Sequence, residues 1–276
     1  MFNFIATEHT QQDERHNLIS STPVKLPKLF RKLVSTEAAI IGLSAIIWVM
    51  LLAAPASLGI KHCHVSSAGA SVASLDMLMK MNPLSTQLFG WGLMVGAMML
   101  PKLLGPLQAI RLQSLKRHRT TNSVLFILGY WATWMLAGIP IIAVIIVSNL
   151  FLPMSYVAAA VVFVIALIWQ FSPIKQRFLN LGHEHQLLAA FGWRAFYDAF
   201  AYGLTHGLWC VGAGWALMLF PMLLPAGHNL AMLAVTVIML SEHLENPRFP
   251  KWAFNPRLRL FRYIVARFQM HLAKSG

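Results

Sequence analysis

Long apolar stretches alternate with short polar and basic connections along most of the chain. Each stretch approaches the roughly 20 residues that a helix needs to cross the hydrocarbon core of a bilayer. Four stretches are separate and a fifth is long enough to cross twice: 38–58, 87–107, 124–150, 154–171 and 199–240. Within the fifth, Pro221, Pro225 and Gly227 supply turn residues that split it into a helical hairpin. The pattern therefore predicts an all-α membrane protein, a bundle of about six transmembrane helices.

The two ends of the chain differ from this central region. We expect a polar N-terminal arm at 1–35, the six-helix transmembrane domain at 36–244 and a basic amphipathic tail at 245–276. The arm lacks the apolar core of a cleavable signal peptide, so the first apolar stretch is expected to remain as a membrane span. In the tail, apolar residues recur at helical spacing with arginines elsewhere on the helical wheel, which is typical of a helix lying on an anionic leaflet.

The positions of lysine and arginine predict the orientation. In the six-span arrangement, 20 of the 22 basic residues fall on one side of the membrane and only Lys61 and Lys80 on the other. Because positive charge is retained in the cytoplasm during insertion, we expect both termini to be cytoplasmic. The predicted location is the bacterial inner (cytoplasmic) membrane, with multiple passes.

Composition supports this location and excludes other classes. The chain is 57% hydrophobic and 11% charged, with a mean hydropathy of +0.61, which excludes a soluble domain. The net charge of +13 is explained by basic residues at the ends of spans, without the aromatic and basic interleaving typical of nucleic-acid binding. The expected partner surface is a lipid bilayer with an anionic cytoplasmic leaflet, and no nucleic acid is expected.

Few polar residues remain inside the spans. They contain no Asp or Glu and one histidine, His206, with Lys102 expected at the cytoplasmic edge and Glu242 at the end of the last span. Haem held by two histidines inside the bilayer is therefore not expected. A nucleophilic triad lacks its acid. We expect no enzyme activity and no haem or nucleotide.

Sulfur-containing side chains are the main chemical feature of the spans. Met94 and Met98 lie one helical turn apart and Met99 follows them. In the fifth span, small and metal-binding residues advance by three or four positions and form one stripe: Gly203, His206, Gly207, Cys210, Gly214 and Met218. Gly92 and Gly96 offer a matching surface on the second span. Thiolate and thioether ligands favour Cu(I), so this region is a candidate copper site, with Glu242 and His243 at the end of the path.

A second candidate cluster lies in the first loop, which the charge pattern places on the outer side. It contains six soft or borderline metal ligands: His62, Cys63, His64, Met77, Met79 and Met81. We expect this loop to capture metal, unless the alternating methionines beside Asp76 are an ordinary helix start on the membrane surface.

Three segments resemble a known family: 91–101, the QFSPIK stretch at 170–175, and 203–242. They are similar to the bacterial family of predicted metal-binding integral membrane proteins, catalogued as a domain of unknown function, over roughly residues 40–245. The resemblance implies that the metal region contains Met94, Met98, Met99, Cys210 and Met218. Where that family shows cysteines, this chain has Phe178, Gly182, Ala213 and Gly214. His183 and His185 lie beside two of these positions and are candidate substitutes.

Two functional hypotheses from different classes follow. The first is an inner-membrane protein that binds a soft transition metal, copper as Cu(I), for transport or for delivery to a partner such as another membrane protein or a metal chaperone. The alternative is a non-catalytic structural or accessory subunit whose glycine faces pack against a larger membrane complex. In that case the methionines and Cys210 are packing residues, and His206 is hydrogen-bonded to a neighbouring helix.

Overall fold

The computed structural model describes residues 26–53, 75–76, 79–80, 83–152, 155–184, 186–189, 191–252, 265 and 269–270. The chain divides into two units, Met1–Ala39 and Ile40–Gly276. The described part of the first unit is the start of helix α2 (Leu26–Ala53). The N-terminal arm before it, and most of the predicted amphipathic tail, lie outside the described residues.

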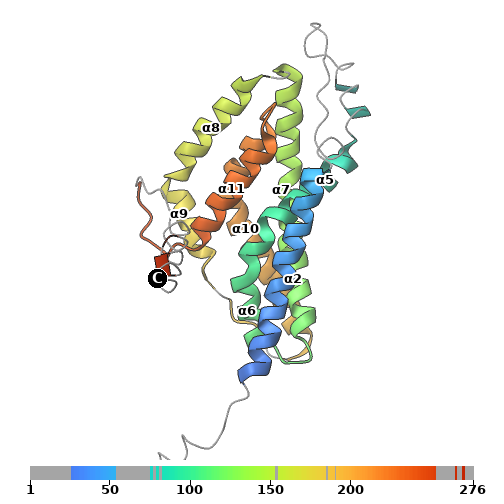
Figure 1. Ribbon diagram of the computed structural model, residues 1–276, viewed down its shortest axis with the longest axis vertical. Coiled ribbons are helices and arrows are strands. Elements are labelled where there is room, and N and C mark those ends of the chain that lie inside the picture. Colours follow the sequence, from blue (N-terminus) through green and yellow to red (C-terminus); the bar gives the residue numbers. More distant parts are fainter. Residues whose placement is uncertain are drawn as a thin grey trace, which may run out of the picture. The chain divides into compact units, whose positions relative to one another are not determined.

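The second unit is built from helices (Figure 1). After the second half of α2, they are α5 (Leu84–Met99), the 3₁₀ helix η1 (Leu100–Leu103), α6 (Leu104–Gln113), α7 (Arg119–Phe151), α8 (Tyr156–Gln170), α9 (Pro173–Leu181), α10 (Gly192–Met222) and α11 (His228–His243). No strand occurs in the part of the chain that the structure describes, so the all-α prediction is confirmed.

Helices α7 and α10 run parallel and form the central contact of the unit. Gly203 faces the backbone of Phe126, and one turn later Gly207 faces Thr133. A Cβ atom at Gly203 would collide with the carbonyl oxygen of Phe126, so only glycine permits this approach. The close contact places the middle of α10 directly against the middle of α7.

The neighbouring helices run antiparallel to this central pair. On α5, the Trp91 indole nitrogen donates to the Trp134 carbonyl oxygen at 2.9 Å, while Gly96 faces Trp131 on the preceding turn of α7. On α8, the Trp169 indole nitrogen donates to the Gly212 carbonyl oxygen at 3.1 Å. Helix α11 returns along α10 after the turn at residues 223–227, where Gly227 has a φ of 77°. The predicted split of 199–240 into a hairpin is confirmed.

The six predicted crossings are supported only in part. Among the described residues, three helical stretches are long and apolar enough to cross a membrane: Leu84–Gln113, Arg119–Phe151 and Gly192–Met222. A fourth is present if the bent pair α8 and α9 counts as one span. The first and last predicted spans correspond to the shorter helical segments Ala38–Ala53 and α11. The alternating helix directions are those that six crossings require, but their number remains a prediction.

The bend between α8 and α9 follows from the Ser172–Pro173 step. The two helices differ in direction by 67°. Proline cannot continue the hydrogen bonding of α8 and forces the residue before it into an extended conformation, as the Ser172 ψ of 146° shows. The Ser172 hydroxyl then caps α9 by accepting from the Lys175 amide at 3.1 Å. The QFSPIK segment therefore turns α9 toward the end of α11.

The predicted match between the glycines of α5 and α10 is wrong. Gly92 and Gly96 face Trp131 of α7, while Gly203, Gly207 and Gly214 of α10 face α7 and Met239 of α11. Both glycine faces are therefore used inside the unit, with α7 packed between them. Glycine spacing predicts a close helix contact, but it does not identify the partner helix.

Candidate metal centre

Cys210 lies at the centre of a buried cluster of polar and sulfur groups. Its thiol is 4.0 Å from the Met99 sulfur at the end of α5. The same Cys210 sulfur accepts from the Lys102 Nζ atom at 3.2 Å and from the Tyr130 hydroxyl at 3.1 Å. The cluster therefore joins α5, η1, α7 and α10 around one sulfur atom.

Pro101 explains why Met99 and Lys102 both reach Cys210. It lies in the 3₁₀ helix η1, which interrupts the α-helical path between α5 and α6. A 3₁₀ helix has three residues per turn, so residues three apart lie on the same side. The Met-x-Pro-Lys order thus directs a thioether and an ammonium group toward one point.

A small pocket lies beside Cys210, with a volume of about 20 Å³. This is enough for about one water molecule or one ion. Its walls come from η1, from α10 and from the C-terminal ends of α9 and α11, and include Lys102, His183, His206, Cys210 and His243. The pocket therefore gathers three imidazoles and one thiol from separate parts of the chain.

His206 occupies the turn of α10 before Cys210. Its buried ring lies between the aromatic rings of Phe126, Tyr130 and Tyr202, with ring-centre distances of 5.8, 6.0 and 5.9 Å. This packing fixes the imidazole at the wall of the pocket. His206 and Cys210 both line the pocket, and their joint binding of one metal ion remains a prediction.

The donor groups fit a metal with a low coordination number. Among the described residues, no three His, Cys, Asp or Glu side chains converge as a metal site. Cys210 and Met99 instead form a thiol and thioether pair, the soft ligand types that select Cu(I). The arrangement does not resemble the four-ligand tetrahedral site of structural zinc.

The other sulfur residues predicted for this site do not line the pocket beside Cys210. Met94 and Met98 are buried in the core on α5, with exposures of 3% and 2%. Met218 is also buried, but it lies eight residues after Cys210, or about 12 Å along the helix axis. Met218 is therefore too far along α10 to share one ion with Cys210. Met99 is the predicted methionine that the structure places beside the thiol.

Glu242 takes part in a buried ion pair. Its carboxylate lies 2.8 Å from the Lys175 Nζ atom, and the two side chains are 2% and 0% exposed. Gln170 joins them by accepting from Lys175 at 2.6 Å and donating to Glu242. The pair connects α9 to α11, and the carboxylate is engaged there rather than at Cys210.

The charge count from the sequence also needs a correction. The sequence predicts Lys102 and Lys175 among the charges at the cytoplasmic surface, yet both are buried. Without these two, 18 basic residues remain on the predicted cytoplasmic side and 2 on the other side. The distribution of charge therefore still predicts that both termini are cytoplasmic.

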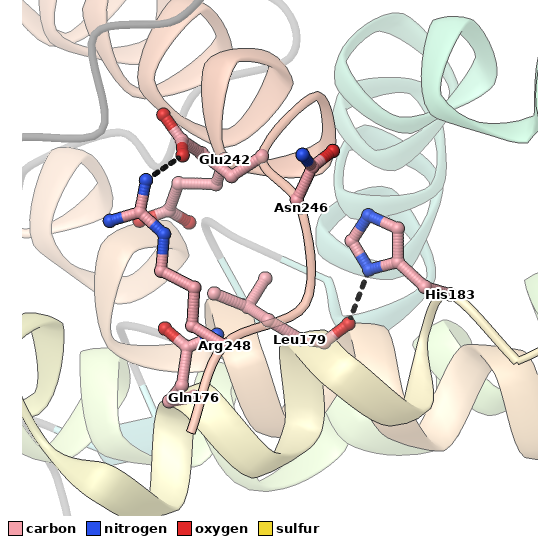
Figure 2. Close-up of a pocket in the computed structure, with 7 residues that line it drawn as sticks. Gln176, Leu179, His183, Glu242, Asn246 and Arg248 are labelled. Atoms are coloured by element: carbon pink, nitrogen blue, oxygen red, sulfur yellow. Dashed lines mark hydrogen bonds and ion pairs between the residues drawn. The ribbon is translucent and has the colours of Figure 1, made fainter. Parts of the chain in front are cut away.

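His183 connects the end of α9 to the end of α11. Its Nδ1 atom lies 2.8 Å from the Leu179 carbonyl oxygen, a contact shown in Figure 2, and its Nε2 atom lies 3.1 Å from the His243 carbonyl oxygen. The His183 ring also stacks on the His243 ring, with centres 5.7 Å apart. Both ring nitrogens of His183 face backbone acceptors, so this side chain acts here as a structural link. His185, the other candidate substitute for the missing cysteines, lies outside the described residues.

Most residues of the candidate cluster in the first loop lie outside the part of the chain that the structure describes. His62, Cys63, His64, Met77 and Met81 lie outside the described residues. Met79 is described and 38% exposed, and Asp76 forms an exposed ion pair with Lys80 at 2.7 Å. The role of this cluster in metal capture remains a prediction.

Lys102 and Tyr130 belong to the site but are not among the site residues predicted from the sequence. Lys102 could have been found, because a lysine within an apolar helix indicates a functional position. Tyr130 has no comparable signal. Its contact with Cys210 follows from the close approach of α7 and α10, which hydrophobic patterning does not reveal.

Comparison with known proteins gives a family match. The family model described as PpoB2, copper chaperone, matches residues 88–253, which is more than half of the chain and includes Met99, Lys102, Tyr130 and Cys210. No curated protein and no solved structure is detectably similar to the chain. The match confirms the resemblance to a metal-binding family at the level of copper, whereas the membrane character of that family remains a prediction. The chain belongs to the PpoB2 copper chaperone family.

Proposed function

We propose that this protein is a membrane-embedded copper chaperone that binds one Cu(I) ion at Cys210 and Met99 and delivers it to a partner protein. The observation that carries the proposal is the buried thiol and thioether pair, 4.0 Å apart, beside a pocket the size of one ion. Membership of the copper chaperone family supports copper as the metal.

Each residue of the cluster has a distinct role in this proposal. Cys210 supplies the main ligand as a thiolate, because the deprotonated sulfur is the form that binds metal. Met99 supplies a weaker thioether ligand, which suits an ion that must later be released. Tyr130 and Lys102 donate to the Cys210 sulfur and hold it at the pocket wall. His206, on the preceding turn, is positioned to complete the ligand set.

The route to the site is expected at one end of the bundle. Residues at or just after the ends of α9 and α11 border the pocket, among them Leu179, His183 and His243. In the orientation predicted from the basic residues, these helix ends face the cytoplasm. Transfer to the partner therefore takes place on the cytoplasmic side of the bacterial inner membrane, while the first loop captures metal from outside.

The accessory-subunit alternative has lost its main support. It depended on glycine faces that are free to pack against another protein, but Gly203, Gly207 and Gly214 pack against α7 and α11 of the same chain.

A Cu(I) titration of the detergent-purified protein tests the proposal. We expect Cys210→Ser to lose one equivalent of Cu(I) in competition with a chromophoric Cu(I) chelator. We expect Met99→Leu to weaken binding by at least about 10-fold, since even outer-shell partners of metal ligands contribute that much. Met98→Leu is the matched control, because Met98 is equally buried and adjacent in sequence, and it should bind as the wild type does. If Cys210→Ser keeps the wild-type stoichiometry and affinity, the assignment is wrong.

A further inference from the structure

Lys102 is buried without an acidic partner in the described part of the chain. Its exposure is 6%, and no carboxylate there lies within ion-pair distance of its Nζ atom. Lys175 provides the comparison, because that buried lysine is paired with Glu242 at 2.8 Å. The atom that Lys102 contacts is the Cys210 sulfur at 3.2 Å. A buried ammonium group is costly unless it is paired, so this placement calls for a reason.

We infer that Lys102 makes the Cys210 site selective for a monovalent metal ion over divalent ions. This inference rests on the proposed function and names the charge of the ion that the site accepts. The charges of a thiolate at Cys210 and of the Lys102 ammonium group sum to zero. A bound Cu(I) ion brings the buried cluster to one positive charge, whereas Zn(II) brings it to two.

The pocket supplies no other charge that would favour a divalent ion. None of the residues that line it is Asp or Glu. The other donor groups at the sulfur and the pocket carry no negative charge: the Tyr130 hydroxyl, the Met99 thioether and the imidazoles of His183, His206 and His243. Divalent ions therefore meet one thiolate and one fixed cation, an unfavourable balance inside a low-dielectric interior.

The size of the effect follows from Coulomb's law. An ion bound to the Cys210 sulfur lies within about 5.5 Å of the Lys102 Nζ atom, because that atom is 3.2 Å from the sulfur and a metal–sulfur bond is about 2.3 Å long. At an effective dielectric constant of about 20, one additional positive charge at that distance lowers a binding constant on the order of 100- to 1,000-fold. Sulfur ligands alone do not achieve this, because thiolates also bind zinc well. The fixed charge thus adds a discrimination that the ligand type does not provide.

The test compares the affinities of Cu(I) and Zn(II) in detergent-purified variants. Neutral Lys102→Met should raise the affinity for Zn(II) relative to Cu(I) on the order of 100-fold, while Lys102→Arg keeps the charge and should keep the wild-type ratio. A ratio is used because any change in the thiolate itself affects both metals alike. Lys116→Gln removes an exposed lysine and serves as the control for net charge, with no expected change in the ratio.

The outcomes separate this inference from the proposed function. If the wild type binds Cu(I) at Cys210 but Lys102→Met leaves the ratio within about threefold of the wild type, the selectivity role is wrong and the proposed function stands. If Lys102→Met does not fold, the Lys102→Arg variant tests the selectivity role instead. It keeps the positive charge, so a changed ratio of Zn(II) to Cu(I) affinity in this variant contradicts the inference. If Cys210→Ser binds Cu(I) as the wild type does, the proposed function itself fails.

Discussion

The Lys175 and Glu242 side chains neutralise each other in the interior of the protein. Glu242→Gln removes the negative charge and leaves the Lys175 ammonium buried without its carboxylate. We expect a loss of about 3–5 kcal/mol in the free energy of unfolding, which is typical when one member of a buried ion pair is removed. Denaturation of the detergent-solubilised protein, followed by circular dichroism, measures this change.

The double variant Lys175→Met/Glu242→Leu is the informative comparison. Replacing both charges with apolar side chains of similar size removes the desolvation cost, so it should be clearly more stable than Glu242→Gln alone. Equal destabilisation of the two variants would show that the charges themselves do not matter. Glu242→Gln should also retain the Cu(I) stoichiometry of the wild type, since the carboxylate is engaged with Lys175 and Gln170. Loss of one equivalent of Cu(I) in the Glu242→Gln variant would show that Glu242 is a metal ligand.

Residue types could be predicted from the sequence better than their contacts. Helical spacing and ligand chemistry identify His206 and Cys210 as candidates, whereas Met99 is a candidate through its place after Met98 and through the family resemblance. Lys102 and Lys175 were misplaced at the surface, because a count of charges at span ends does not distinguish a solvated lysine from a buried one. Burial depends on which helices meet, and that information is not contained in a single helix.

Glycine contacts determine how closely the helices approach. Gly203→Ala places a Cβ atom against the carbonyl oxygen of Phe126, which belongs to backbone and cannot move aside as a side chain can. We expect α7 and α10 to separate at this point, with a loss of about 1–3 kcal/mol in the free energy of unfolding, the range for overpacked interiors. The measurement is the thermal or chemical denaturation midpoint in detergent, together with Cu(I) affinity, because Tyr130 follows Phe126 by one turn of α7.

Gly42→Ala provides the matched control for this prediction. Gly42 is also helical, within α2, and a Cβ atom there has open space. Alanine favours a helix over glycine by about 1 kcal/mol, so this variant should be at least as stable as the wild type. Equal stability of Gly203→Ala and Gly42→Ala would mean that close approach at Gly203 is not required.

The ends of helices can be predicted from the sequence where proline or glycine marks a turn. The hairpin after Met222 and the bend at Ser172–Pro173 follow from proline and glycine. The start of α10 at Gly192, rather than near 199, was not visible because Arg194 and Asp198 interrupt the apolar pattern. Hydropathy marks the apolar part of a helix, whereas backbone hydrogen bonding extends through its polar first turns.

At the scale of the whole molecule, the helix directions and the distribution of basic residues predict the same orientation of the bundle in the membrane. Helices α7 and α10 are parallel while α5, α8 and α11 run the opposite way, as expected if successive helices cross in alternation. With 18 other basic residues predicted on one side from the sequence, both termini and the ends of α9 and α11 are expected in the cytoplasm. The Cys210 pocket, bordered by those two helix ends, then opens toward the cytoplasm.

Labelling of single cysteines with a membrane-impermeant maleimide tests this orientation. The chain has two cysteines, so Cys210→Ser leaves Cys63 as the sole target, and we expect its labelling in intact bacterial cells whose outer membrane is permeable to the reagent. A chain with both cysteines replaced by serine and with Lys251→Cys, an exposed position after α11, should be labelled only after the inner membrane is opened. Labelling of Lys251→Cys in intact cells would reverse the predicted orientation and place the Cys210 pocket near the outer side. The partner proposed to receive copper would then have to be an extracytoplasmic protein, because the pocket is bordered by the end of α11 whichever way the bundle is inserted.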